Sequence, residues 1–168
     1  MIGTAQFVYD ILRDLAKEAD SYACVGVQEG NCLRHVLLGN PCLKRLALCD
    51  TWGPEHGGTN RGGHAHIEKM LRDLGYNGEV LFLDGDSITR LPELSQNYDL
   101  TFVDGGHDEQ TAFSDLMSMW PRTSKFMVVH DVHMDSVQAA LARFLSVMGD
   151  WNAVQYSSNG TGTNVVSR

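Results

Sequence analysis

The chain lacks any long apolar run and any basic segment at its start. No stretch approaches the ~20 apolar residues that a membrane-spanning helix needs, and no basic start followed by an apolar core marks a signal peptide. Only four cysteines occur, and none forms a Cys-x-x-Cys pair of the kind that holds zinc or runs redox chemistry. We therefore expect reduced thiols, a cytoplasmic location and no membrane partner.

The sequence is also poor in basic residues. It has 13 Lys and Arg against 21 Asp and Glu, a net charge of −8 at pH 7, and its basic residues are scattered. Binding to nucleic acid through phosphates requires clustered Lys and Arg, so we expect no nucleic-acid partner. A length of 168 residues with 43% hydrophobic content suits a single domain over residues 1–168.

Short apolar segments alternate with amphipathic segments along the chain. Segments 22–27, 46–49, 80–83, 100–103 and 126–129 predict buried strands, and periodic apolar positions between them predict helices. Near the end, Asn159-Gly160 provides the turn chemistry of a hairpin. This order predicts an α/β fold, with a doubly wound, Rossmann-like, mostly parallel sheet, helices on both faces and a C-terminal antiparallel hairpin.

Titratable side chains follow the last two predicted parallel strands. Asp104-Gly105-Gly106-His107 follows segment 100–103, and His130-Asp131 follows segment 126–129. If the two strands are neighbours, their ends lie roughly 5 Å apart, which brings two carboxylates together with two imidazoles. Carboxylates that close repel each other unless a cation lies between them. A bound metal ion or a positively charged substrate would supply that cation, so we expect an enzyme-like site here.

A glycine-flanked turn, Gly26-Val27-Gln28-Glu29-Gly30, follows the first predicted strand, and Asp50 follows the second. Glycine lets the backbone turn tightly and approach a ligand, and an acid at the second strand end can accept hydrogen bonds from ribose hydroxyls. The Gly-x-Gly-x-x-Gly fingerprint of dinucleotide-binding proteins is absent. A nucleoside-like cofactor therefore fits this sequence better than NAD.

Together these segments resemble the class I S-adenosylmethionine-dependent methyltransferases, and the resemblance covers nearly the whole chain. It rests on segment 24–30, Asp50, the segment Leu83-Asp84-Gly85-Asp86-Ser87 and segment 98–107. Segment 98–107, which ends in Val103-Asp104-Gly105-Gly106-His107, is the most specific part. It is similar to a small-molecule O-methyltransferase branch that resembles macrolide-sugar O-methyltransferases and cephalosporin-hydroxylase-like proteins.

The resemblance implies an enzyme that methylates a hydroxyl group of a small molecule, with S-adenosylmethionine as cofactor and help from a divalent metal, Mg²⁺ or Mn²⁺. It implies His107 as the general base, and Asp104, His130 and Asp131 as the metal ligands. The cofactor would be bound by Gly26, Val27, Gln28, Gly30, Asp50, Thr51, Asp86, Ser87 and Asp104.

Two residues depart from the pattern of that family. Cys24 stands where an acid usually begins the cofactor turn, which removes a contact toward the methionine amino group. His130 stands in place of the first acid of an acidic pair, so an imidazole joins two carboxylates. This donor set shifts the metal preference from Mg²⁺ toward Mn²⁺, Fe²⁺ or Zn²⁺. A backbone hydrogen bond is the alternative role for His130.

Two other functions stay open on the sequence alone. A metal-dependent hydrolase is favoured by the number of candidate metal ligands, which include His64-x-His66 and would be enough for two metal ions. Against it, we expect His64 to lie far from the strand ends. A non-catalytic cofactor-binding protein is favoured by Cys24 only. The Gly-rich segment 53–63 predicts either a lid over the substrate or a surface loop. The sequence does not identify the molecule that accepts the methyl group. It also leaves the oligomeric state open, and a homo-oligomer is compatible with it.

Overall fold

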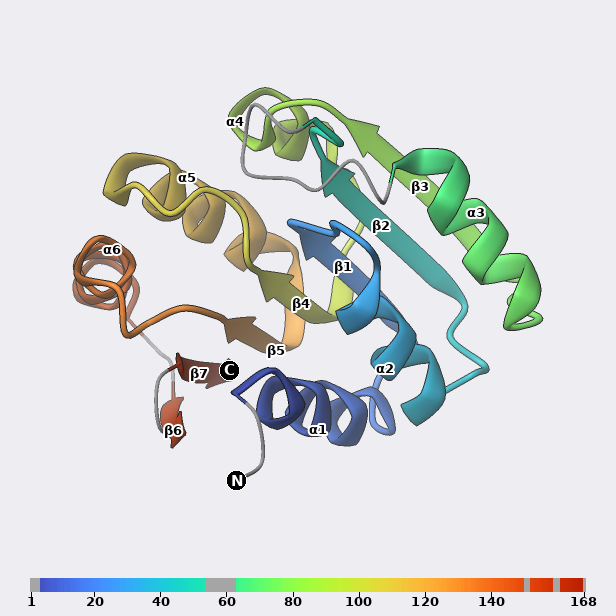
Figure 1. The fold of residues 1–168 in the computed structure, drawn as a ribbon. Coiled ribbons are helices and arrows are strands. Elements are labelled where there is room, and N and C mark those ends of the chain that lie inside the picture. The colour runs from blue at the N-terminus through green and yellow to red at the C-terminus, as the bar shows by residue number, and fades with distance from the viewer. Residues whose placement is uncertain (1–3, 54–62, 150–151, 159–160, 168) are drawn as a thin grey trace.

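A seven-stranded sheet forms the centre of the computed structural model, which describes residues 4–53, 63–149, 152–158 and 161–167. The strand order is β3-β2-β1-β4-β5-β7-β6 (Figure 1). Strands β1 to β5 pair in parallel, and β7 is antiparallel to both of its neighbours, which confirms the predicted sheet. The strands are β1 Ser21–Val25, β2 Arg45–Asp50, β3 Glu79–Asp84, β4 Tyr98–Val103, β5 Thr123–Val129, β6 Asn152–Ser158 and β7 Thr161–Ser167.

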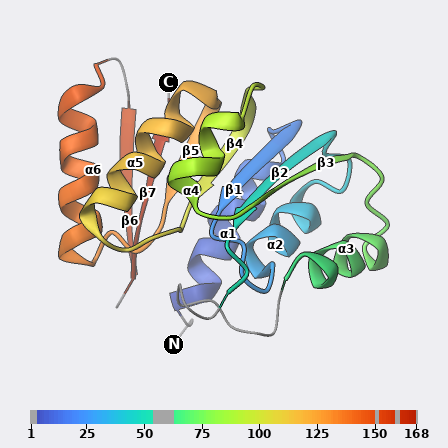
Figure 2. The same cartoon turned by 90° about the horizontal axis from the view of Figure 1, so that it is seen from above.

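Helices cover both faces of the sheet, as predicted. Figures 1 and 2 show α1, α2 and α3 on one face and α4, α5 and α6 on the other. Within the described part of the chain, no helix is long and apolar enough to cross a membrane. The α-helices are α1 Thr4–Ala16, α2 Asn31–Gly39, α3 His64–Asp73, α4 Ser87–Arg90, α5 Glu109–Met119 and α6 Asp135–Val147, and two short 3-10 turns, η2 Leu91–Glu93 and η3 Trp120–Arg122, follow α4 and α5.

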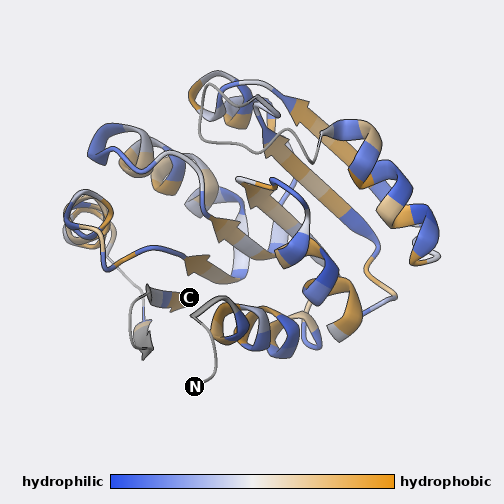
Figure 3. Cartoon of the chain, in the orientation of Figure 1, coloured by the Kyte–Doolittle hydropathy of each residue, from blue (hydrophilic) through white to orange (hydrophobic). Residues whose placement is uncertain are grey.

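The parallel strands are buried on both faces, which explains their continuous apolar sequences. Successive residues of a strand point to opposite faces. In β1, Tyr22 and Cys24 therefore join the core beneath α1 and α2, while Ala23 and Val25 join the core beneath α5 and α6. Figure 3 shows apolar strands enclosed by helices whose outer faces are polar. The predicted hairpin turn at Asn159-Gly160 lies outside the described residues.

The strand order reverses between β1 and β4, and ligands of doubly wound sheets bind beyond the carboxyl ends of the strands at this point. The turn after β1 begins with Gly26, whose φ is +81°. A Cβ atom added there would collide with the backbone carbonyl oxygen of Asp104, at the end of β4. Only glycine lets the two turns approach this closely. The fold thus places the predicted cofactor turn against a predicted metal ligand.

Candidate functional site

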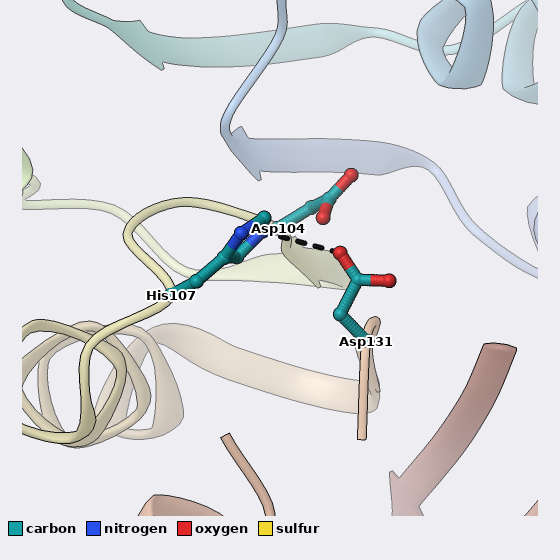
Figure 4. Close-up of side chains that lie close together, drawn as sticks. All are labelled: Asp104, His107 and Asp131. Carbon is teal, nitrogen blue, oxygen red and sulfur yellow. Dashed lines mark ion pairs between the residues drawn. The ribbon is translucent and has the colours of Figure 1, made fainter. Parts of the chain in front are cut away.

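Four titratable side chains meet where β4 and β5 end: Asp104, His107, His130 and Asp131, here called the acid–imidazole cluster. His130 Nδ1 lies 3.2 Å from Asp104 Oδ1 and 3.2 Å from Asp131 Oδ1. His107 Nε2 lies 3.1 Å from Asp131 Oδ2. Figure 4 shows the His107 ring and the carboxylates of Asp104 and Asp131 close together. Because β4 and β5 are neighbours, the predicted convergence of their ends is confirmed.

The positive charge between the two carboxylates belongs to His130. Burial lowers the pKa of His130, but the hydrogen bonds and charges of Asp104 and Asp131 outweigh burial and raise this pKa to about 10. The hydrogen bond from His130 lowers the pKa of Asp131, whereas burial raises the pKa of Asp104. The imidazole is therefore protonated at neutral pH. The sequence suggested a metal ion or a cationic substrate as the cation between the two carboxylates. The structure adds a third candidate, the protonated His130 of the chain itself.

The cluster also has the spacing of a metal site. Asp104, His107 and Asp131 each offer one ligand atom, and these atoms lie within 4.8 Å of one another. Two carboxylates and an imidazole suit a divalent transition metal, so of the two ions that the resemblance implies the donor set fits Mn²⁺. His107 stands in this set, whereas the sequence predicts His130 as the imidazole ligand. His130 contacts the same two carboxylates, and its Nε2 is buried with no hydrogen-bond partner among the described residues.

Backbone strain gathers at the carboxyl ends of the strands. Within the described chain, the non-glycine residues with positive φ are Gln28 (51°), Trp52 (59°) and Asp131 (54°), which follow β1, β2 and β5. Conformations of this kind cost of order 1–3 kcal/mol and persist only where the surroundings hold them. Asp50 holds two of them. Its Oδ2 accepts the backbone N–H groups of Val27 and Gln28, and its Oδ1 accepts that of Trp52, each at 2.7 Å.

A cavity of about 330 Å³ lies among the turns that follow β1 to β4, and we call it the nucleoside cavity. Asp86 at its edge caps α4 by accepting the backbone N–H of Ile88 at 2.8 Å. Among the predicted cofactor residues, Val27 and Gly30 do not line this cavity, and Gly30 instead directly precedes α2, where a side chain would meet Ile67 and Met70. The predicted cofactor residues that do line it are Gly26, Gln28, Asp50, Thr51, Asp86, Ser87 and Asp104.

A second cavity of about 280 Å³, here called the acceptor cavity, lies between α1 and the acid–imidazole cluster. Val8 and Tyr9 of α1 line it, as do Val27, Cys32 and the whole cluster. Both cavities include Gly26, Gln28, Asp104 and His107, so they meet beside the cluster. The sequence does not single out Tyr9, because a helix residue that faces a cavity has the same periodicity as one that faces the core.

His64 lies at a strand end, so the prediction that it is remote from the strand ends is wrong. Helix α3 begins beside β3, and His64 Nδ1 lies 3.1 Å from Asp84 Oδ2. The His64 ring stacks on Phe82 with centroids 3.6 Å apart. Trp52 Nε1 donates to Asp84 Oδ1 at 2.8 Å, so Asp84 joins both sides of the predicted Gly-rich segment. Most of that segment, residues 54–62, lies outside the described residues.

The position of His64 does not add a ligand to the acid–imidazole cluster. His64 lies against β3, and the cluster lies at the ends of β4 and β5. Strands β2 and β1 stand between them in the sheet. The set of histidines that a two-metal hydrolase would need is therefore divided between two separate parts of the sheet.

Comparison with known proteins finds that the sequence is similar to methyltransferases. A family model described as a methyltransferase domain matches residues 24–132. No curated protein matches the sequence. Among solved structures, cofactor-bound Rv0187 from MTB superposes with a TM-score of 0.72 and 20% identity, over 99% of this chain and 81% of that chain.

Two further solved structures show the range of proteins that share this fold. The O-methyltransferase TomG from Streptomyces achromogenes, in complex with SAM, has a TM-score of 0.69 and 16% identity, over 99% of this chain and 81% of that chain. An rRNA methylase from Streptococcus thermophilus has a TM-score of 0.70 and 15% identity, over 100% of this chain and 98% of that chain. Identities this low show a shared fold and do not assign a substrate.

Proposed function

Because the chain belongs to the methyltransferase domain family, we propose that it transfers a methyl group from S-adenosylmethionine to a hydroxyl group of a small molecule. The observation that carries this proposal is the junction of two cavities beside the acid–imidazole cluster. One cavity has the residues expected around a nucleoside, and the other ends in groups that can take a proton. TomG, an O-methyltransferase of the same fold in complex with SAM, supports this choice of cofactor and acceptor group.

The adenosine part of the cofactor would bind in the nucleoside cavity. Asp50 accepts three backbone N–H groups, and a carboxylate has about four acceptor sites, so one site remains for a ribose hydroxyl. Thr51, Asp86 and Ser87 line the part of the cavity on the β3 side, where adenine would lie. When bound, this cofactor supplies a methyl group on a positively charged sulfur, and the acidic residues beside the cavity junction suit that charge.

The acceptor would bind in the acceptor cavity with its hydroxyl group at the cluster. Methyl transfer is an in-line displacement, so the walls of the cavity contribute by aligning the acceptor oxygen. The hydroxyl must lose its proton, and we assign this proton to His107, which lines both cavities and is half-exposed. Asp131, 3.1 Å from His107 Nε2, orients the ring and balances the charge it gains. General-base help is typically worth ~10²–10⁴-fold.

Asp104 and Asp131, together with one imidazole, would hold a divalent ion, which when bound lowers the pKa of an acceptor hydroxyl. We keep His130 as the imidazole ligand, because a neutral imidazole has one free lone pair, and His107 cannot give that pair both to a metal and to a proton. Titration of His107→Asn and His130→Asn with Mn²⁺ tests this choice. We expect His107→Asn to retain Mn²⁺ and to lose turnover, and His130→Asn to lose Mn²⁺. The reverse pattern would make His107 the ligand and refute its role as base.

Calorimetry with S-adenosylmethionine and S-adenosylhomocysteine, in the presence of Mn²⁺, tests the proposed function directly. We expect both to bind, and S-adenosylhomocysteine to form when a panel of hydroxylated small molecules is supplied with S-adenosylmethionine. The absence of binding at high micromolar concentration would overturn the proposal. Gly26→Ala, which forces a Cβ atom against the backbone of Asp104 where the two cavities meet, should abolish binding. Gly149→Ala is the matched control, because a Cβ there meets no atom within 4 Å.

A further inference from the structure

Asp115, on α5, is a buried carboxyl group that the proposed reaction does not use. Among the described residues it is the only Asp, Glu, Lys, Arg or His that is buried, and its exposed fraction is 0%. Neither carboxyl oxygen has a hydrogen-bond partner in the described part of the chain. Such groups are rare in folded proteins because burying a polar group without a partner is costly. This cost calls for a compensating role.

Three residues close to Asp115 belong to the wall of the nucleoside cavity. Asp115 Oδ2 lies 2.6 Å from the point that a Cβ on Gly105 would occupy, and Val25 Cγ1 lies 2.8 Å from the same point. The Ser87 hydroxyl is near enough to lower the pKa of Asp115. Gly105, Val25 and Ser87 each line the cavity. The carboxyl group therefore lies directly behind the cavity wall, where the turns after β3 and β4 meet.

We propose that Asp115 is a positioning residue that acts through Ser87 and Gly105 to hold the adenine end of the nucleoside cavity in its binding shape. This inference rests on the proposed function, since it assigns a role toward the same cofactor. Gly105 lacks a side chain, which gives the carboxyl group its space beside the turn after β4. Ser87 is the first residue of α4, so the same carboxyl group also fixes the turn after β3.

The protonation of Asp115 agrees with this role. Burial raises the pKa of Asp115 to about 7, the Ser87 hydroxyl opposes the shift, and the charges of Asp86 and Asp108 reinforce it. Cys49, the remaining titratable group beside it, has its own pKa raised by burial and by Asp115. A neutral carboxyl group can donate as well as accept, so on cofactor binding it can form with the Ser87 hydroxyl the hydrogen bond that it lacks here, which leaves the hydroxyl proton of Ser87 to donate into the cavity.

Substitution of Asp115 separates positioning from plain structural support. Asp115→Leu replaces an unpartnered buried polar group by an apolar group of similar size, a change that is neutral or stabilising for the fold. We therefore expect the melting temperature to be unchanged or higher, while the affinity for S-adenosylhomocysteine falls about tenfold or more. Asp115→Asn keeps a donor in place and should restore most of that affinity. The control Leu116→Val, buried in the same helix and lining neither cavity, should lower stability and leave affinity unchanged.

A double-mutant cycle with Ser87→Ala tests the path of action. If Asp115 acts through Ser87, Asp115→Leu should weaken binding much less in the Ser87→Ala background than in the wild type. Additive losses, or an Asp115→Leu protein that binds S-adenosylhomocysteine as the wild type does, would overturn the inference. A wild-type protein that binds no S-adenosylhomocysteine would instead overturn the proposed function. If Asp115→Leu does not fold, the need for the carboxyl group is structural, and the inference fails.

Discussion

Raising the pH from 7 to 8.5 should tighten Mn²⁺ binding, because the metal and a proton compete for the acid–imidazole cluster. His130 carries that proton between Asp104 and Asp131, and its pKa is raised to about 10. At pH 7 this pKa lies about three units above the pH, so removing the proton costs ~4 kcal/mol. With His130 as a ligand, the affinity for Mn²⁺ should rise about tenfold per pH unit across this range.

The assay is calorimetric titration with Mn²⁺ at several pH values, in pairs of buffers that differ in ionisation enthalpy. These pairs report the number of protons released, which we expect to be about one per metal bound. His107→Asn is the matched variant, because it keeps His130 and should keep the slope with pH. Affinity that does not change between pH 7 and pH 8.5, or binding without proton release, would refute the competition between His130 and the metal.

Three further predictions concern the fold around the site. Gly26→Ala should cost about 3 kcal/mol or more in urea unfolding, because it forces a side chain into a left-handed turn and against the backbone of Asp104; a cost equal to that of Gly149→Ala would contradict this. Asp50→Asn should lower the free energy of unfolding by roughly 2 kcal/mol, because charge-assisted hydrogen bonds to three backbone N–H groups are weakened. The same change should weaken the binding of S-adenosylhomocysteine at least about tenfold. Unchanged affinity in calorimetry would rule out a role for Asp50 in cofactor binding. The carboxyl group of Asp115 ionises near pH ~4 in the unfolded chain and near pH 7 in the folded chain. The free energy of unfolding should therefore fall by up to ~4 kcal/mol as the pH rises through that window. Urea unfolding at several pH values measures this fall, and Asp115→Asn should abolish it.

The sheet and the convergence at its carboxyl edge could be predicted because both follow from local patterns. Buried parallel strands have continuous apolar sequences, and the polar residue that follows each strand lies at the same edge. Asp104 and Asp131 were therefore assigned to one site from their positions after two strands.

The features that were missed depend on distances between segments that are remote in sequence. His130 becomes the internal cation only because its Nδ1 lies 3.2 Å from each of two carboxylates. The contact of His64 with Asp84 depends on where α3 begins relative to β3, which apolar periodicity does not determine. Asp115 is a polar residue on an amphipathic helix, and such residues usually face solvent. Its burial follows from the packing of α5 over the glycine turn after β4.

The positive φ angles of Gln28, Trp52 and Asp131 set this protein's stability against its activity. Glycine adopts such angles at little cost, so selection for heat resistance alone should replace Gln28 and Asp131 by glycine. The Asp131 replacement would remove a carboxylate of the site, and the Gln28 replacement would loosen the turn at the junction of the two cavities. Laboratory evolution for thermal tolerance should therefore erode this edge of the sheet first, unless turnover is selected at the same time.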